Sequence, residues 1–284
     1  MEVKKLTGKR LGRLRPEHPP HLDPRVLHLS DYIDEKKLAA RKAGALPAIK
    51  PYRDWSAWAA TQLGGADKFG AMLNESLGDC TCAAIGHAIQ VLTAVAGTIV
   101  TPTDDQVLAM YEQSGYVPGN PSTDNGWMIQ SALQYWKTTG LAGHKCDAFL
   151  AVNPQNMTHV DFAFETFGLV DIGVMLPISA QNQSMLWSVP QGGFTADDEP
   201  GSWGGHSVIV TKRAVTSPIT PGTVLRHGLI TWGQADWRIT PAFWRLCVDE
   251  CWVAFSTDFL KKNDLTDTGL NQAQLLADLK AVAN

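Results

Sequence analysis

The pattern of apolar residues in the first half of the chain is typical of helices. Between residues 80 and 95, small and apolar side chains recur three and four positions apart, which predicts a buried helix. Further helices are predicted at about residues 103–114 and 126–139, so residues 66–166 are expected to be mainly helical. The apolar face of the first helix consists of Ala84, Ile85, Ala88, Ile89 and Leu92.

The second half of the chain has the pattern of strands. Runs rich in β-branched and aromatic residues alternate there with turns rich in proline and glycine. The predicted strands cover residues 169–178, 206–213, 226–233 and 251–256. Helices followed by antiparallel strands with short turns indicate an α+β protein.

The chain divides by pattern into four segments. An extended N-terminal arm is predicted at residues 1–54, a helical half at 55–166, a β-rich half at 167–262 and an amphipathic C-terminal helix at 263–284. We expect the last helix to pack on the body of the protein or on a neighbouring molecule. Its apolar face carries Leu270, Leu275, Leu279 and Val282.

Charge separates the arm from the rest of the chain. Residues 1–54 hold 13 lysines and arginines against 7 acidic residues, whereas the remaining residues hold 11 against 21. The arm is rich in proline, and its one helical pattern lies at residues 30–43, where Ser30 can act as the N-cap. Such an arm can contact nucleic acid or an acidic surface, or it can remain a solvated tail.

Composition describes a globular protein with free thiols. The chain has 284 residues, of which 44% are hydrophobic, and this is enough for a sizeable core. It has five cysteines and no secretory signal pattern, so we expect a reducing, cytoplasmic location. The apolar stretch at residues 85–100 is interrupted by polar residues and is shorter than a membrane span, so no transmembrane helix is expected.

Cys80 is the candidate nucleophile. It follows Gly78 and Asp79 at the start of the predicted helix. The free N–H groups and the positive dipole end at a helix N-terminus favour a thiolate, which is the reactive form of cysteine. A buried structural cysteine is the alternative, because free cysteine is among the most buried residue types. A histidine partner would distinguish the two.

His206 is the candidate base. It follows the glycine-rich loop at residues 200–205 and begins a β-branched strand, so it is expected at a rim and not in the centre of a core. It lies 126 residues after Cys80, which is close to the separation expected between cysteine and histidine in papain-type enzymes.

With these residues, the chain resembles the papain-like cysteine peptidases. "LGDCTCAAI" is similar to their nucleophile segment, "STDNGWMIQSALQYW" to the segment that lines the cleft, "GGHSVIV" to the histidine strand and "LITWGQADW" to the turn that follows. The layout also resembles papain-fold proteins encoded by bacteria and tailed phages. The resemblance implies a helical half and a barrel-like β half with a cleft between them, and a thiol hydrolase that acts on a peptide or another amide.

The resemblance also implies roles for the residues around the pair. Asn74 stands where the family has a glutamine and would hold the oxyanion together with the backbone N–H of Cys80. Substrate-binding roles fall on Asn125, Gly126, Trp203 and Trp232.

The position that orients the histidine in this family is occupied by Ile230. Its side chain cannot form a hydrogen bond. If the histidine is oriented at all, the resemblance leaves Thr231, Gln234 or Asp236 for that role.

Other readings of the same sequence remain open. Cys80, Cys82 and His87 lack a second pair of ligands at the spacing of a zinc site, and no phosphate-binding glycine motif is present, so no metal or cofactor is expected. A protein of another class is also consistent with the pattern. In that reading the fold is a scaffold, and the arm ties the subunit into a homo-oligomer or a phage particle, as a virion component. An arm that runs along its own cleft favours a latent peptidase, whereas an arm that reaches away favours the scaffold.

Overall fold

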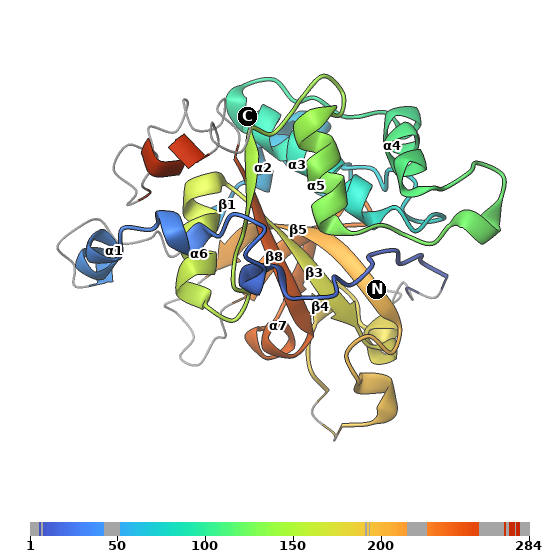
Figure 1. Cartoon of the computed structure of the whole chain (residues 1–284). Helices are drawn as coiled ribbons and strands as arrows, with labels where there is room; N and C mark the ends of the chain where they lie inside the picture. Colours follow the sequence, from blue (N-terminus) through green and yellow to red (C-terminus); the bar gives the residue numbers. More distant parts are fainter. Residues whose placement is uncertain are drawn as a thin grey trace.

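The computed structural model describes residues 6, 8–42, 52–190, 192, 194–214, 226–255, 270, 273–275 and 277–278. Figure 1 shows the helices α2, α3, α4 and α5 gathered on one side of the molecule and the large sheet on the other. The predicted α+β class is confirmed. Within the described ranges, no helix combines the length and apolar character needed to cross a membrane.

The helical half is built around a buried helix, α3 (Cys80–Ala96). Small side chains such as Ala83, Ala84 and Gly86 allow neighbouring elements to pack closely on several of its faces. Helices α2 (Ser56–Leu63), α4 (Asp104–Tyr111) and α5 (Ile129–Thr138) pack against it from the helical side, and strand β5 packs against it from the sheet. The predicted helices at residues 80–95, 103–114 and 126–139 are therefore present with slightly different ends.

The β half is a single sheet whose strand order is β2-β8-β3-β5-β6-β7-β4, with β1 paired to β5 outside this path. Its pairs are antiparallel except for β4 and β7. Strand β3 is buried along almost its whole length, because the N-terminal arm reaches it at Gly173 and helices α6 (Met157–Phe167) and α7 (Pro241–Cys247) pack against it. The strands are β1 (Tyr52–Asp54), β2 (Ala148–Ala151), β3 (Val170–Leu176), β4 (Leu186–Trp187), β5 (Gly204–Ala214), β6 (Arg226–Thr231), β7 (Gln234–Ile239) and β8 (Val248–Phe255).

Helices α6 and α7 were not predicted individually, although α6 lies at the end of the segment that was expected to be mainly helical. Helix α6 (Met157–Phe167) begins at an Asn156 cap, and helix α7 (Pro241–Cys247) begins at a Thr240 cap with a proline in its first turn. Cys247 ends α7, and strand β8 begins at Val248, three residues before the predicted strand at 251–256.

The arm differs from the prediction at its helix. A 3₁₀ helix covers Leu29–Tyr32, and the α-helix α1 (Glu35–Lys42) follows it. The side chain of Asp34 accepts the backbone N–H groups of Lys36 and Lys37, so Asp34 caps α1. The prediction of Ser30 as the cap is wrong, because Ser30 lies inside the 3₁₀ helix.

The arm crosses its own molecule, and Figure 1 shows this blue segment passing between α5 and the strands β3 and β5. Its side chains Leu6, Leu29, Tyr32, Ile33 and Leu38 are buried in the core. Only part of the predicted C-terminal helix lies within the described residues. There, Leu270 pairs with Ile33 and Leu275 is buried, so this part of the tail packs on the arm. The four predicted segment boundaries stay predictions.

Candidate functional site

Cys80 begins helix α3 and is almost fully buried, with 1% of its surface exposed. The pKa of its thiol is raised to about 12, mainly by burial and in part by the charge of the nearby Asp79. Hydrogen bonds to the backbone of Ser207 and of Gly12 oppose this rise, as does the charge of Arg13. The thiol therefore lies between strand β5, at the residue that follows His206, and the N-terminal arm.

His206 lies in strand β5, which packs against α3, and its side chain is fully buried. Its Nε2 atom is 2.8 Å from the hydroxyl oxygen of Thr231, and its ring stacks on Trp232 with the ring centroids 4.6 Å apart. Its Nδ1 atom is buried and has no hydrogen-bond partner in the part of the chain that the structure describes. Burial, the charge of Arg13 and His87 together lower the pKa of His206 to about 3.

Of the three residues proposed to orient His206, Thr231 makes the contact. Strand β6 changes its pairing register with β7 between Leu229 and Thr231. An irregularity of this kind redirects side chains locally, which accounts for the position of the Thr231 hydroxyl beside Nε2 of the imidazole. Ile230 packs in the core with 1% of its surface exposed.

The other two candidates are engaged elsewhere. The side-chain oxygen of Gln234 accepts the indole N–H of Trp237, and the carboxylate of Asp236 lies 3.4 Å from the ammonium group of Lys212 at the surface. Neither side chain is bonded to His206 in the described structure.

Asn74 lies in the segment that leads into α3, where Met72 and Leu73 have positive φ angles of 53° and 70°. It is 2% exposed, and its amide nitrogen donates a hydrogen bond to the carbonyl oxygen of Leu77 at 3.2 Å. In this state, the amide that was predicted to hold the oxyanion is bonded to its own turn.

The predicted cleft residues are found in different surroundings. Gly126 is buried against the arm, because a Cβ atom built on it would lie 2.0 Å from the carbonyl oxygen of Gly12. Asn125 is exposed and is bonded within its own loop, to Ser122. Trp203 stacks on Trp232, with centroids 6.1 Å apart, so the two tryptophans and His206 form one stacked column.

The arm pairs with both sides of this site. The backbone N–H of Trp127 donates to the oxygen of Gly12 at 2.7 Å, and the N–H of Leu14 donates to the oxygen of Trp127 at 2.9 Å. On the opposite side, the N–H of Arg13 donates to the oxygen of Gly205 at 3.0 Å. The arm thus bridges the helical half and the β half through Arg13, with the backbone of Gly12 against the Cys80 thiol.

Glycines make this close approach possible. A Cβ atom on Gly12 would lie 1.7 Å from the carbonyl oxygen of Gly78, and a Cβ atom on Gly205 would lie 2.3 Å from the carbonyl oxygen of Arg13. We call the space that the arm fills between Gly78 and Gly126 on one side and Gly205 on the other the groove. Any larger residue at Gly12 would displace the arm from this groove, because a Cβ atom cannot approach a backbone oxygen so closely.

Sequence reasoning missed Tyr111 and Asp124. The phenol of Tyr111 donates to Asp124 at 2.6 Å and accepts the N–H of Gly126 at 2.9 Å, while Asp124 also accepts the N–H of Gly78 at 2.9 Å. This network joins the two glycines that line the groove. Asp124 stands two residues before Gly126 in the segment "STDNG", but nothing in the sequence pairs it with a tyrosine in another helix.

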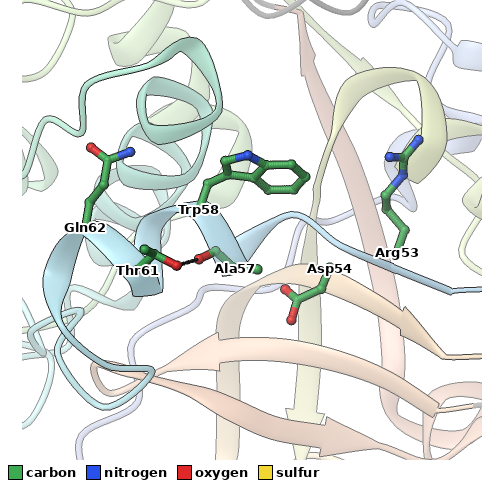
Figure 2. A pocket seen from close by; sticks show the side chains of 6 residues that line it. All are labelled: Arg53, Asp54, Ala57, Trp58, Thr61 and Gln62. Carbon is green, nitrogen blue, oxygen red and sulfur yellow. Dashed lines mark hydrogen bonds between the residues drawn. The ribbon is translucent and has the colours of Figure 1, made fainter.

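Other features of the surface are separate from this site. No group of three or more potential metal ligands occurs within the described ranges, and all five cysteines are free and buried. A surface pocket of about 470 Å³ is formed by β1 and α2 and contains none of the residues discussed above. Figure 2 shows its lining, with Trp58 between Gln62 and Arg53.

Comparison with known proteins identifies the fold. No protein-family model matches the sequence, and no curated protein matches it. The structure is similar to xylellain, a cysteine protease from Xylella fastidiosa, with 14% sequence identity, a TM-score of 0.61 and coverage of 90% of this chain and 100% of that chain. It is also similar to procathepsin L2 proteinase from Tenebrio molitor larval midgut, with 12% identity, a TM-score of 0.55 and coverage of 90% and 81%.

A third similar structure is a recombinant stem bromelain precursor, with 12% identity, a TM-score of 0.53 and coverage of 90% of this chain and 80% of that chain. The predicted papain-like fold is therefore confirmed. The predicted relationship to a bacterial or phage branch stays a prediction.

Proposed function

We propose that the protein is a latent thiol hydrolase, a peptidase or amidase, that uses Cys80 and His206 and is covered by its own N-terminal arm. The observation that carries this proposal is the state of the His206 ring. One nitrogen is held by Thr231. The other is buried, has no hydrogen-bond partner among the described residues, and lies beside the backbone that contacts the Cys80 thiol. A base for the thiol needs such a free nitrogen.

The reaction follows from this arrangement. With its proton on Nε2, His206 donates to the Thr231 hydroxyl, and its Nδ1 lone pair accepts the Cys80 proton. The thiolate attacks the acyl carbon, and the tetrahedral oxyanion is held by the backbone N–H of Cys80 and the amide of Asn74. His206 then returns the proton to the leaving amine. Water, deprotonated by His206, attacks the resulting thioester and releases the acid and the free thiol.

The proposal requires Asn74 to change partner. Its amide is bonded to Leu77 in the covered state, so an oxyanion would have to replace the Leu77 carbonyl as the acceptor. A negatively charged oxygen is a stronger acceptor than a neutral carbonyl, which favours this exchange in the transition state.

The covered state explains why the pair is inactive at rest. A thiol with a pKa of about 12 and an imidazole with a pKa of about 3 are both neutral at pH 7. Burial is the largest cause of both shifts, and the charge of Arg13 of the arm also lowers the pKa of His206. Departure of the arm would hydrate both groups, and this favours proton transfer from sulfur to nitrogen. Loss of the Arg13 charge would raise the pKa of His206 and also that of Cys80.

The path of the arm favours a hydrolase over a phage or oligomer scaffold. Gly12, Arg13 and Leu14 pair with Trp127 and Gly205 of the same chain, and the arm buries Leu29 and Tyr32 in its own body. A tether that joins subunits would bury such residues in a neighbour.

The test is to displace the arm in the full-length chain with Gly12→Val, because a side chain at this position clashes with the backbone of Gly78. The variant should react with a thiol-reactive peptide probe at Cys80 much faster than the unchanged protein does, and it should hydrolyse peptides. Glu17→Ala, at an exposed arm residue, is the matched control and should remain inert. Hydrolysis should disappear in the double variants with Cys80→Ala or His206→Ala.

Two results would contradict the proposal. One is a Gly12→Val protein that is labelled no faster at Cys80 than at the buried Cys82 or Cys146. The other is rapid labelling at Cys80 without hydrolysis of any peptide or amide in a broad substrate library.

A further inference from the structure

The side chain of Arg13 is fully buried, with none of its surface exposed. One guanidinium nitrogen lies 2.7 Å from a carboxylate oxygen of Glu250, and the other lies 2.8 Å from a carboxylate oxygen of Asp249 and also contacts the sulfur of Met175. An arginine is thus bound in a pocket of the body that has two carboxylates at its end.

The pocket depends on an irregularity in strand β8. Gly173 of β3 pairs with Glu250, but the next residue, Val174, pairs with Val248, so Asp249 is an extra residue in β8. Consecutive strand residues normally point to opposite faces. The bulge instead turns the carboxylates of Asp249 and Glu250 to the same guanidinium, and bulges often occur beside functional sites.

The body holds Glu250 in place without the arm, whereas the ion-pair partners of Asp249 are Arg13 and Arg15 of the arm. The indole N–H of Trp252 donates to one Glu250 oxygen at 2.6 Å, which leaves the other oxygen free for Arg13. Behind it, the hydroxyl of Ser207 donates to Asp171 at 2.8 Å. These contacts preorganise the pocket for a cation.

The shape of the pocket also matches a guanidinium group. A Cβ atom on Gly173 would lie 2.4 Å from a guanidinium nitrogen of Arg13, so a glycine at this position leaves the room that the planar group occupies. Two carboxylate partners on two different nitrogens suit the fork of an arginine better than the single point charge of a lysine.

The charges give an emptied pocket a strong preference for a cation. Burial raises the pKa of Glu250, and the largest opposing influence is the charge of Arg13. For Asp171, burial and Glu250 raise the pKa well above its usual value, while Ser207 and Arg13 lower it. Removal of the arginine would leave these acids facing one another in a poorly solvated space.

The pocket is next to the candidate nucleophile. Arg13 follows Gly12, whose backbone contacts the Cys80 thiol, and the N–H of Arg13 is bonded to Gly205, which directly precedes His206. A ligand that fills this pocket as Arg13 does would therefore place its adjacent peptide group over Cys80.

We propose that the pocket of Asp249, Glu250 and Gly173 selects substrates that carry an arginine side chain within one residue of the bond to be cleaved, and that Arg13 of the arm occupies this specificity pocket in the latent state. The part of this inference that concerns cleavage rests on the proposed hydrolase function. The part that concerns binding of a guanidinium group does not.

The binding part is tested without catalysis, in full-length Arg13→Ala. Millimolar ethylguanidinium should raise the thermal unfolding midpoint of this variant, whereas ethylurea, its neutral counterpart, should not. Adding Glu250→Gln should remove the response, and the unchanged protein, whose pocket is filled, should show none. Equal responses to the two compounds, or an undiminished response after Glu250→Gln, would overturn the proposal.

The substrate part is tested in Gly12→Val with two peptides that differ only by arginine or citrulline, which has the same shape and no charge. Binding of the two peptides is compared by letting them compete with each other for Gly12→Val/Cys80→Ala, so the result does not depend on whether the protein is a hydrolase. The same measurement replaces the ethylguanidinium test if Arg13→Ala does not fold. We expect a preference for arginine of about 10- to 100-fold in binding and in kcat/KM, lost on Glu250→Gln.

The two ideas fail in distinguishable ways. Selective arginine binding without any hydrolysis contradicts the hydrolase and leaves the pocket intact. Hydrolysis with equal rates for arginine and citrulline contradicts the pocket and leaves the hydrolase intact.

Discussion

The Nε2 atom of His206 lies 2.8 Å from the hydroxyl oxygen of Thr231, which directly precedes the tryptophan that stacks on the same imidazole. The ring is therefore held on one edge by a hydroxyl and on one face by Trp232. A hydroxyl can accept a proton from Nε2 or donate one to it, so it orients the ring in either tautomer but stabilises an imidazolium less than a charged partner would.

Replacement of Thr231 by valine tests this contact, because valine keeps the shape and removes the hydroxyl. In the Gly12→Val background we expect a loss of about 10- to 100-fold in kcat, with little change in KM, since the ring loses its orientation but the groove is unchanged. Thr231→Ser should retain most of the activity. Equal kcat values for the valine and serine variants would show that Thr231 does not orient His206.

The pH dependence of Cys80 alkylation should distinguish the covered and open states. With a pKa of about 12, roughly one Cys80 thiol in ten thousand is ionised at pH 8 in the covered protein, and the arm also blocks the reagent. Iodoacetamide modification, followed by mass spectrometry from pH 6 to pH 10, should be negligible in the unchanged chain. In Gly12→Val it should be rapid and should reach its plateau at lower pH. Superimposable profiles would argue against the arm as the cause of the raised pKa.

Sequence patterns singled out Cys80 as the candidate nucleophile and His206 as the candidate base because each stands in a local motif. Cys80 begins a helix of small residues, and His206 follows a glycine loop and begins a strand. The strands at residues 169–178, 206–213, 226–233 and 251–256 were predictable for the same reason, since their β-branched runs are local.

The remaining parts of the site depend on contacts between distant segments. Thr231 could be named only as one of three alternatives, because a register irregularity decides which side chain reaches His206. The pairing of Arg13 with Asp249 and Glu250 joins residues more than 230 positions apart through a bulge. Neither the bulge nor the course of the arm leaves a periodic signal in the sequence.

Tyr111→Phe should destabilise the segments around Gly78 and Gly126 that line the groove, without altering Cys80 or His206. It removes the hydroxyl that joins Asp124 to the backbone of Gly126 and leaves a buried N–H without this acceptor. We expect a loss of about 1–3 kcal/mol in the free energy of unfolding, measured by urea denaturation. Tyr135→Phe, at a partly buried tyrosine of α5, is the control and should cost less. Equal losses of unfolding free energy in Tyr111→Phe and Tyr135→Phe would show that the hydrogen bonds of Tyr111 to Asp124 and Gly126 do not stabilise the protein.

Arg13→Ala should destabilise the protein in a pH-dependent way. Loss of one partner from a buried ion pair typically costs about 3–5 kcal/mol near neutral pH. Arg13 opposes the raised pKa values of Glu250 and Asp171, so its removal raises both pKa values further in the folded state. An acid whose pKa is raised on folding stabilises the folded state most at low pH. It loses this contribution as the pH rises above the ordinary value, 4.5 for glutamate, because the unfolded chain then releases its proton first.

The difference in unfolding free energy between the unchanged protein and Arg13→Ala should therefore grow from pH 5 to pH 8 in urea titrations. Arg15→Ala supplies the matched control, because Arg15 pairs with the same Asp249 but has 65% of its side chain exposed. Its loss should cost less than about 1 kcal/mol and should vary little with pH, as is usual for surface ion pairs. A constant difference for Arg13→Ala across this range would mean that the buried acids do not respond to the arginine. The specificity pocket inferred from them would then lose its electrostatic basis.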